Sequence, residues 1–198
     1  MKLAPDAKTV NINSVFLGNR VALRAPKLSD AEQIIEMLAV SQKFHERWNP
    51  PIKPDDLELP AMRKRIVEQR RLFKADRDYK MVFTLGAKGP VIGRVTLSQV
   101  YRGLFQNAYL GYFIDGRYKQ QGLTSEAVRL ALDMAFGPLG LHRIQAAIMP
   151  HNQASLALIR KIGLRYEGKA ERYLKLDGAW QDHLFFAITA EEWPDKQM

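Results

Sequence analysis

The feature that most constrains this fold is a strand, a tight polar loop and a helix in direct succession. The apolar run Tyr109–Ile114 predicts the strand, and Lys119–Thr124 forms the loop. The helix after it shows apolar residues at helical spacing, namely Ala127, Leu130, Ala131 and Met134. The first amides of a helix lack an intrahelical partner and lie at the positive end of its dipole. The stretch therefore predicts an anion site, although an ordinary turn explains it as well.

Three residues of this loop and helix have particular chemistry. Gly122 lets the backbone approach a phosphate with no side chain in the way. Thr124 or Ser125 is expected to cap the helix, and Glu126 suits its first turn.

A second polar loop has the same relation to the next strand. Arg143–Ile148 predicts that strand, and Asn152 is expected to cap a short helix that ends at Gly163. Strand, helix and strand imply parallel pairing with a right-handed crossover. The two polar loops then lie at the same end of the sheet, where ligands of such sheets bind. This coincidence favours the anion site over the ordinary turn.

The remaining elements predict antiparallel strands around this pair. Residues 1–18 are expected to form a flexible lead-in, and no linker divides residues 1–198, so we expect one domain. The expected elements are, in chain order, a strand at 20–25, a helix from Ser29 or Asp30 through Leu38, a loop at 44–51, a basic helix at 57–74, strands at 81–85 and 91–100, a loop at 101–107, and a closing hairpin of strands 172–176 and 180–189 around Asp177-Gly178. The predicted class is α+β, layered α/β/α, with a mixed, mostly antiparallel sheet, a central parallel pair and flanking helices.

Composition excludes several classes of function. The chain has no cysteine, which excludes a thiol nucleophile and thiolate metal sites, and its four histidines show no metal-ligand spacing, so no metal is expected. No apolar run is long enough to span a membrane, and the first residues lack the apolar core of a signal peptide. We therefore expect a cytoplasmic protein that does not bind membranes.

The net charge of +9 favours acidic partners such as a phosphorylated cofactor, RNA or a ribonucleoprotein surface. The densest basic cluster, residues 63–74, is explained by the solvated face of a helix or by contact with RNA. No nucleic-acid-binding module accompanies the charge, so sequence-specific binding is not expected.

The order of elements and the two loops resemble the GCN5-related N-acetyltransferase (GNAT) superfamily over Arg20–Trp193. Lys119–Thr124 is similar to that family's pyrophosphate loop, with Gly122 matching, and Asn152–Ser155 is similar to its Asn-x-x-Ser helix start. A narrower resemblance is to the ribosomal-protein-alanine N-acetyltransferases, in particular those acting on small-subunit ribosomal protein five. The strings that carry it include Arg102-Gly103-x-Phe105, Tyr109-Leu110-Gly111-Tyr112, Met149-Pro150-His151-Asn152 and Tyr173-Leu174-x-x-Asp177-Gly178.

The resemblance implies acetyl transfer from acetyl-CoA to an amine, and it assigns the cofactor contacts. Asn152 and Ser155 contact the cofactor, and Ser155 also hydrogen-bonds or protonates the departing thiolate. The backbone of Tyr112, Phe113 and Ile114 pairs with pantetheine. The amides that hold the pyrophosphate belong to Lys119, Gln120, Gln121, Gly122, Leu123 and Thr124.

The base and the acceptor contacts are less defined by the resemblance. Some relatives carry a glutamate where this chain has Tyr109, so a water relay through Tyr109 or backbone groups is expected, and plain strand packing is the alternative for Tyr109. The residues expected to line the substrate cleft are Trp48, Arg102, Phe105 and Tyr173.

Three functions follow from these residues. The first is N-terminal alanine acetylation of a ribosomal protein, with the ribosome or a pre-ribosomal particle as a wider partner. The second is acetylation of a small amine. The third is a low-activity, acetyl-CoA-binding ribosome-assembly factor, which the missing glutamate keeps open.

Overall fold

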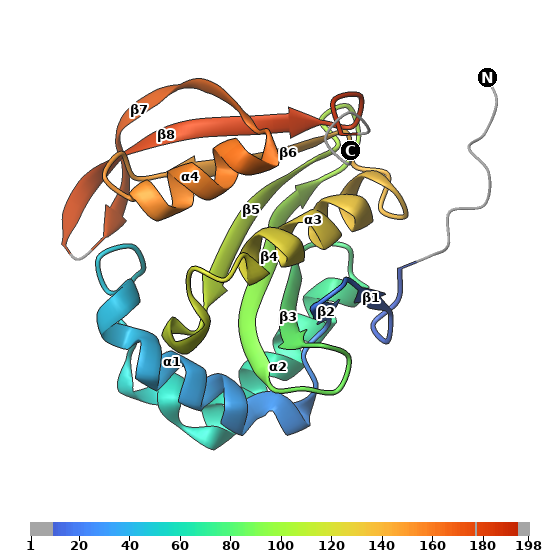
Figure 1. Cartoon of the computed structure of the whole chain (residues 1–198), viewed down its shortest axis with the longest axis vertical. Coiled ribbons are helices and arrows are strands. Elements are labelled where there is room, and N and C mark those ends of the chain that lie inside the picture. The colour runs from blue at the N-terminus through green and yellow to red at the C-terminus, as the bar shows by residue number, and fades with distance from the viewer. Residues whose placement is uncertain (1–9, 177, 194–198) are drawn as a thin grey trace.

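An eight-stranded sheet in the order β1-β2-β3-β4-β5-β6-β8-β7 runs through the computed structural model, which describes residues 10–176 and 178–193 (Figure 1). Among the described pairings, β5 and β6 are parallel and the others are antiparallel. The strands are β1 Val15–Leu17, β2 Val21–Arg24, β3 Tyr79–Leu85, β4 Val91–Tyr101, β5 Asn107–Ile114, β6 Arg143–Ile148, β7 Arg165–Leu176 and β8 Ala179–Thr189. The predicted mixed sheet with a central parallel pair is confirmed.

Among the residues that the structure describes, four helices cover the two faces of this sheet. Helices α1 (Ala31–His45) and α2 (Leu59–Lys74) pack together on one face, against strand residues that include Val82 and Phe113. Helices α3 (Leu123–Phe136) and α4 (Gln153–Ile162) pack on the other, where Phe83 belongs to the larger core. Neighbouring residues such as Val82 and Phe83 serve opposite faces because strand side chains alternate. Three short 3₁₀ helices complete the described part of the chain, at Leu28–Asp30, Pro54–Leu57 and Gly116–Tyr118.

Some predicted boundaries are wrong. The expected lead-in over 1–18 includes β1, which pairs with β2, while residues 1–9 lie outside the described residues. Helix α1 continues to His45 instead of giving way to a loop at Phe44. It does so because the His45 ring stacks on Phe113 with ring centroids 3.8 Å apart, a long-range contact that local sequence does not show.

The closing hairpin is longer than predicted. Strand β7 begins at Arg165, and its register against β8 shifts at two places, between Tyr166 and Gly168 and between Ala170 and Leu174. The turn residue Asp177 lies outside the described residues, and Gly178 has a φ of 77°.

Candidate functional site

The parallel pair separates part-way along its length. Strands β5 and β6 are in register only over Asn107–Tyr109 and Arg143–Gln145. Beyond Tyr109, β5 still pairs with β4 on its other side up to Ile114. The backbone of Leu110–Ile114 therefore faces an opening toward β6 without strand partners there. Backbone N–H and C=O groups seek partners, so this edge is suited to pair with an extended ligand.

The N-terminus of α3 lies just past the end of β5 and has the features of an anion site. Gly122 is the N-cap, with a φ of 76° that favours glycine. The first intrahelical bond runs from the Glu126 amide to the Gly122 carbonyl (3.2 Å). The amides of Leu123, Thr124 and Ser125 precede that bond and have no intrahelical partner. The predicted cap at Thr124 or Ser125 is wrong, because both residues lie inside the helix and the cap makes no side-chain bond.

Glu126 attaches this helix start to the beginning of β2. Its Oε1 accepts hydrogen bonds from the amides of Arg20 (2.7 Å) and Val21 (3.3 Å). Burial acts to raise the pKa of Glu126, but these amides and the Arg20 guanidinium outweigh it and hold the pKa below its usual value. Arg20 also donates from Nη1 to the Gln121 carbonyl (2.9 Å). The arrangement fixes the loop and places a guanidinium beside Gly122.

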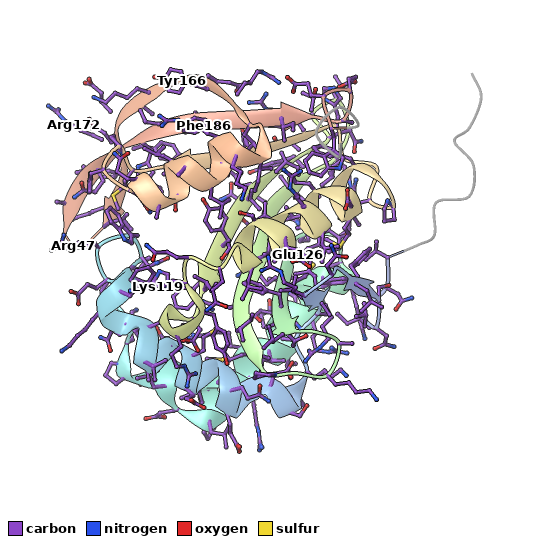
Figure 2. All side chains as sticks on the ribbon, in the orientation of Figure 1. Arg47, Lys119, Glu126, Tyr166, Arg172 and Phe186 are labelled. Atoms are coloured by element: carbon purple, nitrogen blue, oxygen red, sulfur yellow. The ribbon has the colours of Figure 1, made fainter. Side chains whose placement is uncertain are left out.

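The other predicted loop residues differ in whether their side chains can reach a ligand. Figure 2 shows Lys119 on the connection before α3 and Glu126 near the start of that helix. The Lys119 ammonium lies 4.8 Å from the centre of the Phe44 ring, and this cation–π contact restrains the Lys119 side chain. Gln120 has a φ of 60°, and Leu123 is buried in the core, so Leu123 offers a ligand its backbone alone.

The start of α4 meets β5 across the opening. The Asn152 side chain accepts a hydrogen bond from the Ser155 amide (3.2 Å), which confirms the predicted cap. The Tyr112 hydroxyl donates to the Ser155 carbonyl (3.3 Å), and burial raises the pKa of Tyr112 to about 12. Ser155 is half-buried, and its hydroxyl makes no hydrogen bond to a described residue. The two predicted polar loops therefore do lie at the same end of the sheet.

Tyr109 and Tyr173 lie together. Burial raises the pKa of Tyr173, and the neighbouring Tyr109 hydroxyl raises it further. The Tyr173 ring also contacts Phe185 edge-on, with centroids 4.9 Å apart. Residues at Tyr109 and Phe113 point away from the α3 and α4 face of β5, whereas Tyr112 belongs to that face. The strand therefore separates two compartments.

The opened strand pair between two helix N-termini matches a known family. A family model described as the acetyltransferase (GNAT) domain matches residues 20–165. The chain belongs to the GNAT acetyltransferase family. It is an acetyl-CoA-dependent N-acetyltransferase, as the resemblance in the sequence implied.

Relatives of this GNAT enzyme cover nearly the whole chain. A Bacillus subtilis protein named "Probable N-acetyltransferase YjcK" is 34% identical, over 86% of this chain and 94% of its own. The Escherichia coli [ribosomal protein uS5]-alanine N-acetyltransferase is 32% identical, over 88% of this chain and 90% of its own. The structure of Mycobacterium smegmatis RimJ in complex with CoA-disulfide superposes with a TM-score of 0.83 at 32% identity, covering 88% of this chain and 84% of that one.

Within residues 10–176 and 178–193 of this GNAT enzyme, no group of three or more His, Cys, Asp or Glu side chains could hold a metal ion. Within the same residues, none of the helices has the length and hydropathy needed to cross a bilayer.

Trp48 of this GNAT enzyme lies next to the α4 start. Its ring centroid is 5.2 Å from that of His151, the residue before the Asn152 cap. The connection after α1 therefore reaches the C-terminal end of β6, and Trp48 and His151 border the opening from opposite elements.

Two residues predicted to line the substrate cleft lie at the start of β5. Arg102 and Phe105 occupy the β4–β5 loop, which precedes the first residue of β5, whereas the opening begins after Tyr109 and α3 follows the end of the strand. Arg102 donates to both carboxylate oxygens of Asp76 (2.6 and 2.7 Å) and to the Leu139 carbonyl (2.7 Å). Arg102 therefore secures this loop, and the role of Arg102 and Phe105 in the substrate cleft stays a prediction.

The structure adds two residues that the sequence did not single out for this site. His45 lies at the end of α1 with its Nε2 2.7 Å from the Ile114 carbonyl, so Nε2 carries the proton. Burial lowers the pKa of His45. Arg94 lies on β4 with its guanidinium carbon 5.1 Å from the centre of the Phe113 ring. A lone arginine in the apolar run Val91–Leu97 was the available signal for Arg94, whereas nothing in the local sequence marks His45.

Proposed function

We propose that this enzyme acetylates the α-amine of a protein N-terminus, with alanine first and a ribosomal protein as substrate. Its 32% identity to the uS5-alanine N-acetyltransferase of Escherichia coli supports the substrate. The net charge of +9 suits an acidic ribosomal or pre-ribosomal surface, and such a substrate places the enzyme in the cytoplasm.

For the cofactor, the arrangement of backbone groups supports a specific set of contacts. The amides of residues 119–124 are proposed to hold the pyrophosphate, with Arg20 and Lys119 adding positive charge. The edge at Tyr112, Phe113 and Ile114 has no β6 residue paired with it and is proposed to pair with pantetheine, although the Ile114 carbonyl already accepts a hydrogen bond from His45. Asn152 and Ser155 then lie where α4 meets that edge.

Acetyl-CoA supplies the thioester carbonyl when it is bound. In the transfer an N–C bond forms, the C–S bond breaks, the amine loses one proton and the thiolate gains one. The Ser155 hydroxyl is proposed to donate that proton, since it is half-buried at the start of α4 and has no described partner. Tyr109, beside Tyr173 on the acceptor side of β5, is proposed to pass the amine's proton toward solvent.

The observation that supports an α-amine is that β5 carries no carboxylate between Asn107 and Ile114. A free α-amine has a pKa of about 7.7–8.0, whereas a lysine side chain has about 10.4. Near pH 7 an appreciable fraction of N-terminal amines is therefore already neutral, whereas almost no lysine side chain is neutral. An enzyme that presents a tyrosine instead of a carboxylate base favours the α-amine.

A small-molecule amine is the second candidate. The pocket beside Arg94 has a volume of about 470 Å³, within the usual range for small ligands. A peptide N-terminus also enters a pocket of this size, so the acceptor must be decided by experiment.

The test is mass spectrometry of a peptide that begins with alanine and contains one internal lysine, after incubation with acetyl-CoA. We expect the acetyl group on the α-amine, and a matched peptide with a blocked N-terminus should stay unmodified. Modification mainly at lysine would contradict the proposal. Failure to modify either amine while a free amino acid is acetylated would favour the small-molecule candidate.

A further inference from the structure

A pocket on the α1 and α2 side of the sheet lies next to β5. It is lined by the last turn of α1, the connection from α1 to α2, α2 itself, and Arg94 and Phe113 of β4 and β5. Phe113 follows Tyr112 in the strand and points to the opposite face. The pocket is therefore separated from the proposed cofactor cleft by one strand, as an acceptor site needs to be.

The floor of this pocket contains a cation that forms no ion pair with a described carboxylate. Arg94 is half-buried, and burial, followed by the charge of Arg65, lowers its pKa to about 10, so it remains protonated at neutral pH. Its described contact is with the Phe113 ring, and no hydrogen bond or ion pair joins it to a described carboxylate. Removing an unpaired guanidinium from water is costly.

The acidic groups around the pocket do not form an ion pair with Arg94. The charge of Asp56 acts to raise the pKa of Arg94, but Asp56 forms its ion pair with Arg65 and accepts a hydrogen bond from the Lys53 amide (3.0 Å). Glu46 also lines the pocket, but it is exposed at the end of α1. Arg47 adds a third cation to the lining, and Figure 2 shows it on the connection after α1. His45 is kept neutral by burial. Cations therefore outnumber anions, three to two, in the lining.

We propose that this pocket binds a carboxylate of the acceptor, with the Arg94 guanidinium as its anchoring donor, so that the enzyme prefers α-amines that carry a nearby acidic group. The inference rests on the proposed function, acetylation of an α-amine. The planar fork of an arginine matches a carboxylate through two parallel hydrogen bonds. Phe113 fixes the Arg94 side chain by stacking, which leaves its donors available to a ligand.

The carboxylate has two possible sources. In a peptide it is an aspartate or glutamate side chain a few residues after the N-terminus, and in a free amino acid it is the α-carboxylate. In a protein substrate the α-carboxylate lies at the other end of the chain, so the proposal commits to a side chain, and the free amino acid is a separate arm of the test.

The test compares peptides with amidated C-termini that begin with alanine and carry glutamate or glutamine at one of positions two to five. A free alanine arm tests the second source. For the wild-type enzyme, kcat/KM should be at least about tenfold higher for glutamate than for glutamine at the preferred position, the size of a charged hydrogen bond. Calorimetric binding of the same peptides without acetyl-CoA should show the same preference. Preference for free alanine over every peptide would overturn the side-chain assignment.

Variants then assign the preference to Arg94. R94Q should remove the discrimination by raising KM for the glutamate peptide to that of the glutamine peptide, and R94K should restore part of it. R63Q is the matched control, because Arg63 is exposed on α2 and does not line the pocket. It loses the same charge and should keep the discrimination.

The outcomes separate this inference from the proposed function. Equal kcat/KM for both wild-type peptides, with acetylation still on the α-amine, would overturn the inference and leave the function intact. No acetylation of any peptide α-amine would overturn the function itself. If R94Q does not fold, the wild-type comparison still decides whether a carboxylate is recognised.

Discussion

Replacing Gly122 by aspartate tests the proposed pyrophosphate site. A Cβ at this position would lie 3.3 Å from the Arg20 Nη2, so the new carboxylate would sit among the groups proposed to hold phosphate. Two unit charges about 5 Å apart at an effective dielectric constant of about 20 repel by roughly 3 kcal/mol. That energy corresponds to a loss of roughly 200-fold in CoA affinity.

The assay is thermal unfolding with and without CoA. At a CoA concentration of about 100 times the wild-type Kd, binding stabilises the fold by about 2.7 kcal/mol. For a chain of this length, that raises Tm by roughly 5–11 °C. After a 200-fold loss of affinity, the same concentration contributes only about 0.2 kcal/mol by the same relation, and the shift falls below about 1 °C.

Gly140→Asp is the matched control. Gly140 is an exposed glycine past the C-terminal end of α3, with a φ of 58° and nothing within 4 Å of a Cβ. The control adds the same charge and similar backbone strain, of order 1 kcal/mol, far along the chain from the loop. It should retain the full CoA shift. Equal shifts in Gly122→Asp and Gly140→Asp would refute the pyrophosphate assignment.

Three further predictions concern neighbouring parts of the site. Ser155→Ala should lower kcat more than it weakens CoA binding, because its hydroxyl is proposed to act as thiolate charge develops, and equal losses by kinetics and calorimetry would instead indicate a binding role. Asn152→Ala should cost about 1 kcal/mol of unfolding free energy in urea titration, because it removes the bond accepted from the Ser155 amide (3.2 Å), and an unchanged midpoint would contradict that role. His45 has a pKa lowered by burial from 6.5, so the stability it contributes is complete above that pH and is lost as the pH falls. Between about pH 7.5 and about pH 5.5, His45→Gln should therefore lose less unfolding free energy than the wild type, and parallel pH profiles would show that His45 titrates normally.

Local sequence predicted the strands, the helices and the end of the sheet where the polar loops meet. Asn152 was recognisable as a cap because a cap bond joins residues three apart, and it does accept from Ser155. The alternation and helical spacing of apolar residues are similarly local, since each element must bury one face. The predicted boundaries were wrong where a tertiary contact extends an element, as at His45, which stacks on Phe113 of a strand distant in sequence.

The placement of single residues in the site was less predictable. Arg102 occurs in one of the strings that carry the family resemblance, yet its guanidinium bonds Asp76 and its loop lies before β5. Such a string identifies a family, but it does not show whether one of its residues binds substrate or stabilises the fold. Tyr109 and Tyr173 were both predicted, and the structure brings them together from strands that are distant in sequence.

By itself, the sequence determined the order of elements, the glycine at the α3 start and the parallel connection, because these depend on backbone conformation, capping and handedness within short segments. The tertiary structure decided where β5 and β6 part, which residues surround Arg94, and how Glu126 reaches the amide of Arg20 across 106 residues. Those features depend on contacts between segments that no local pattern links, and they form only when the two faces of the sheet are packed at once.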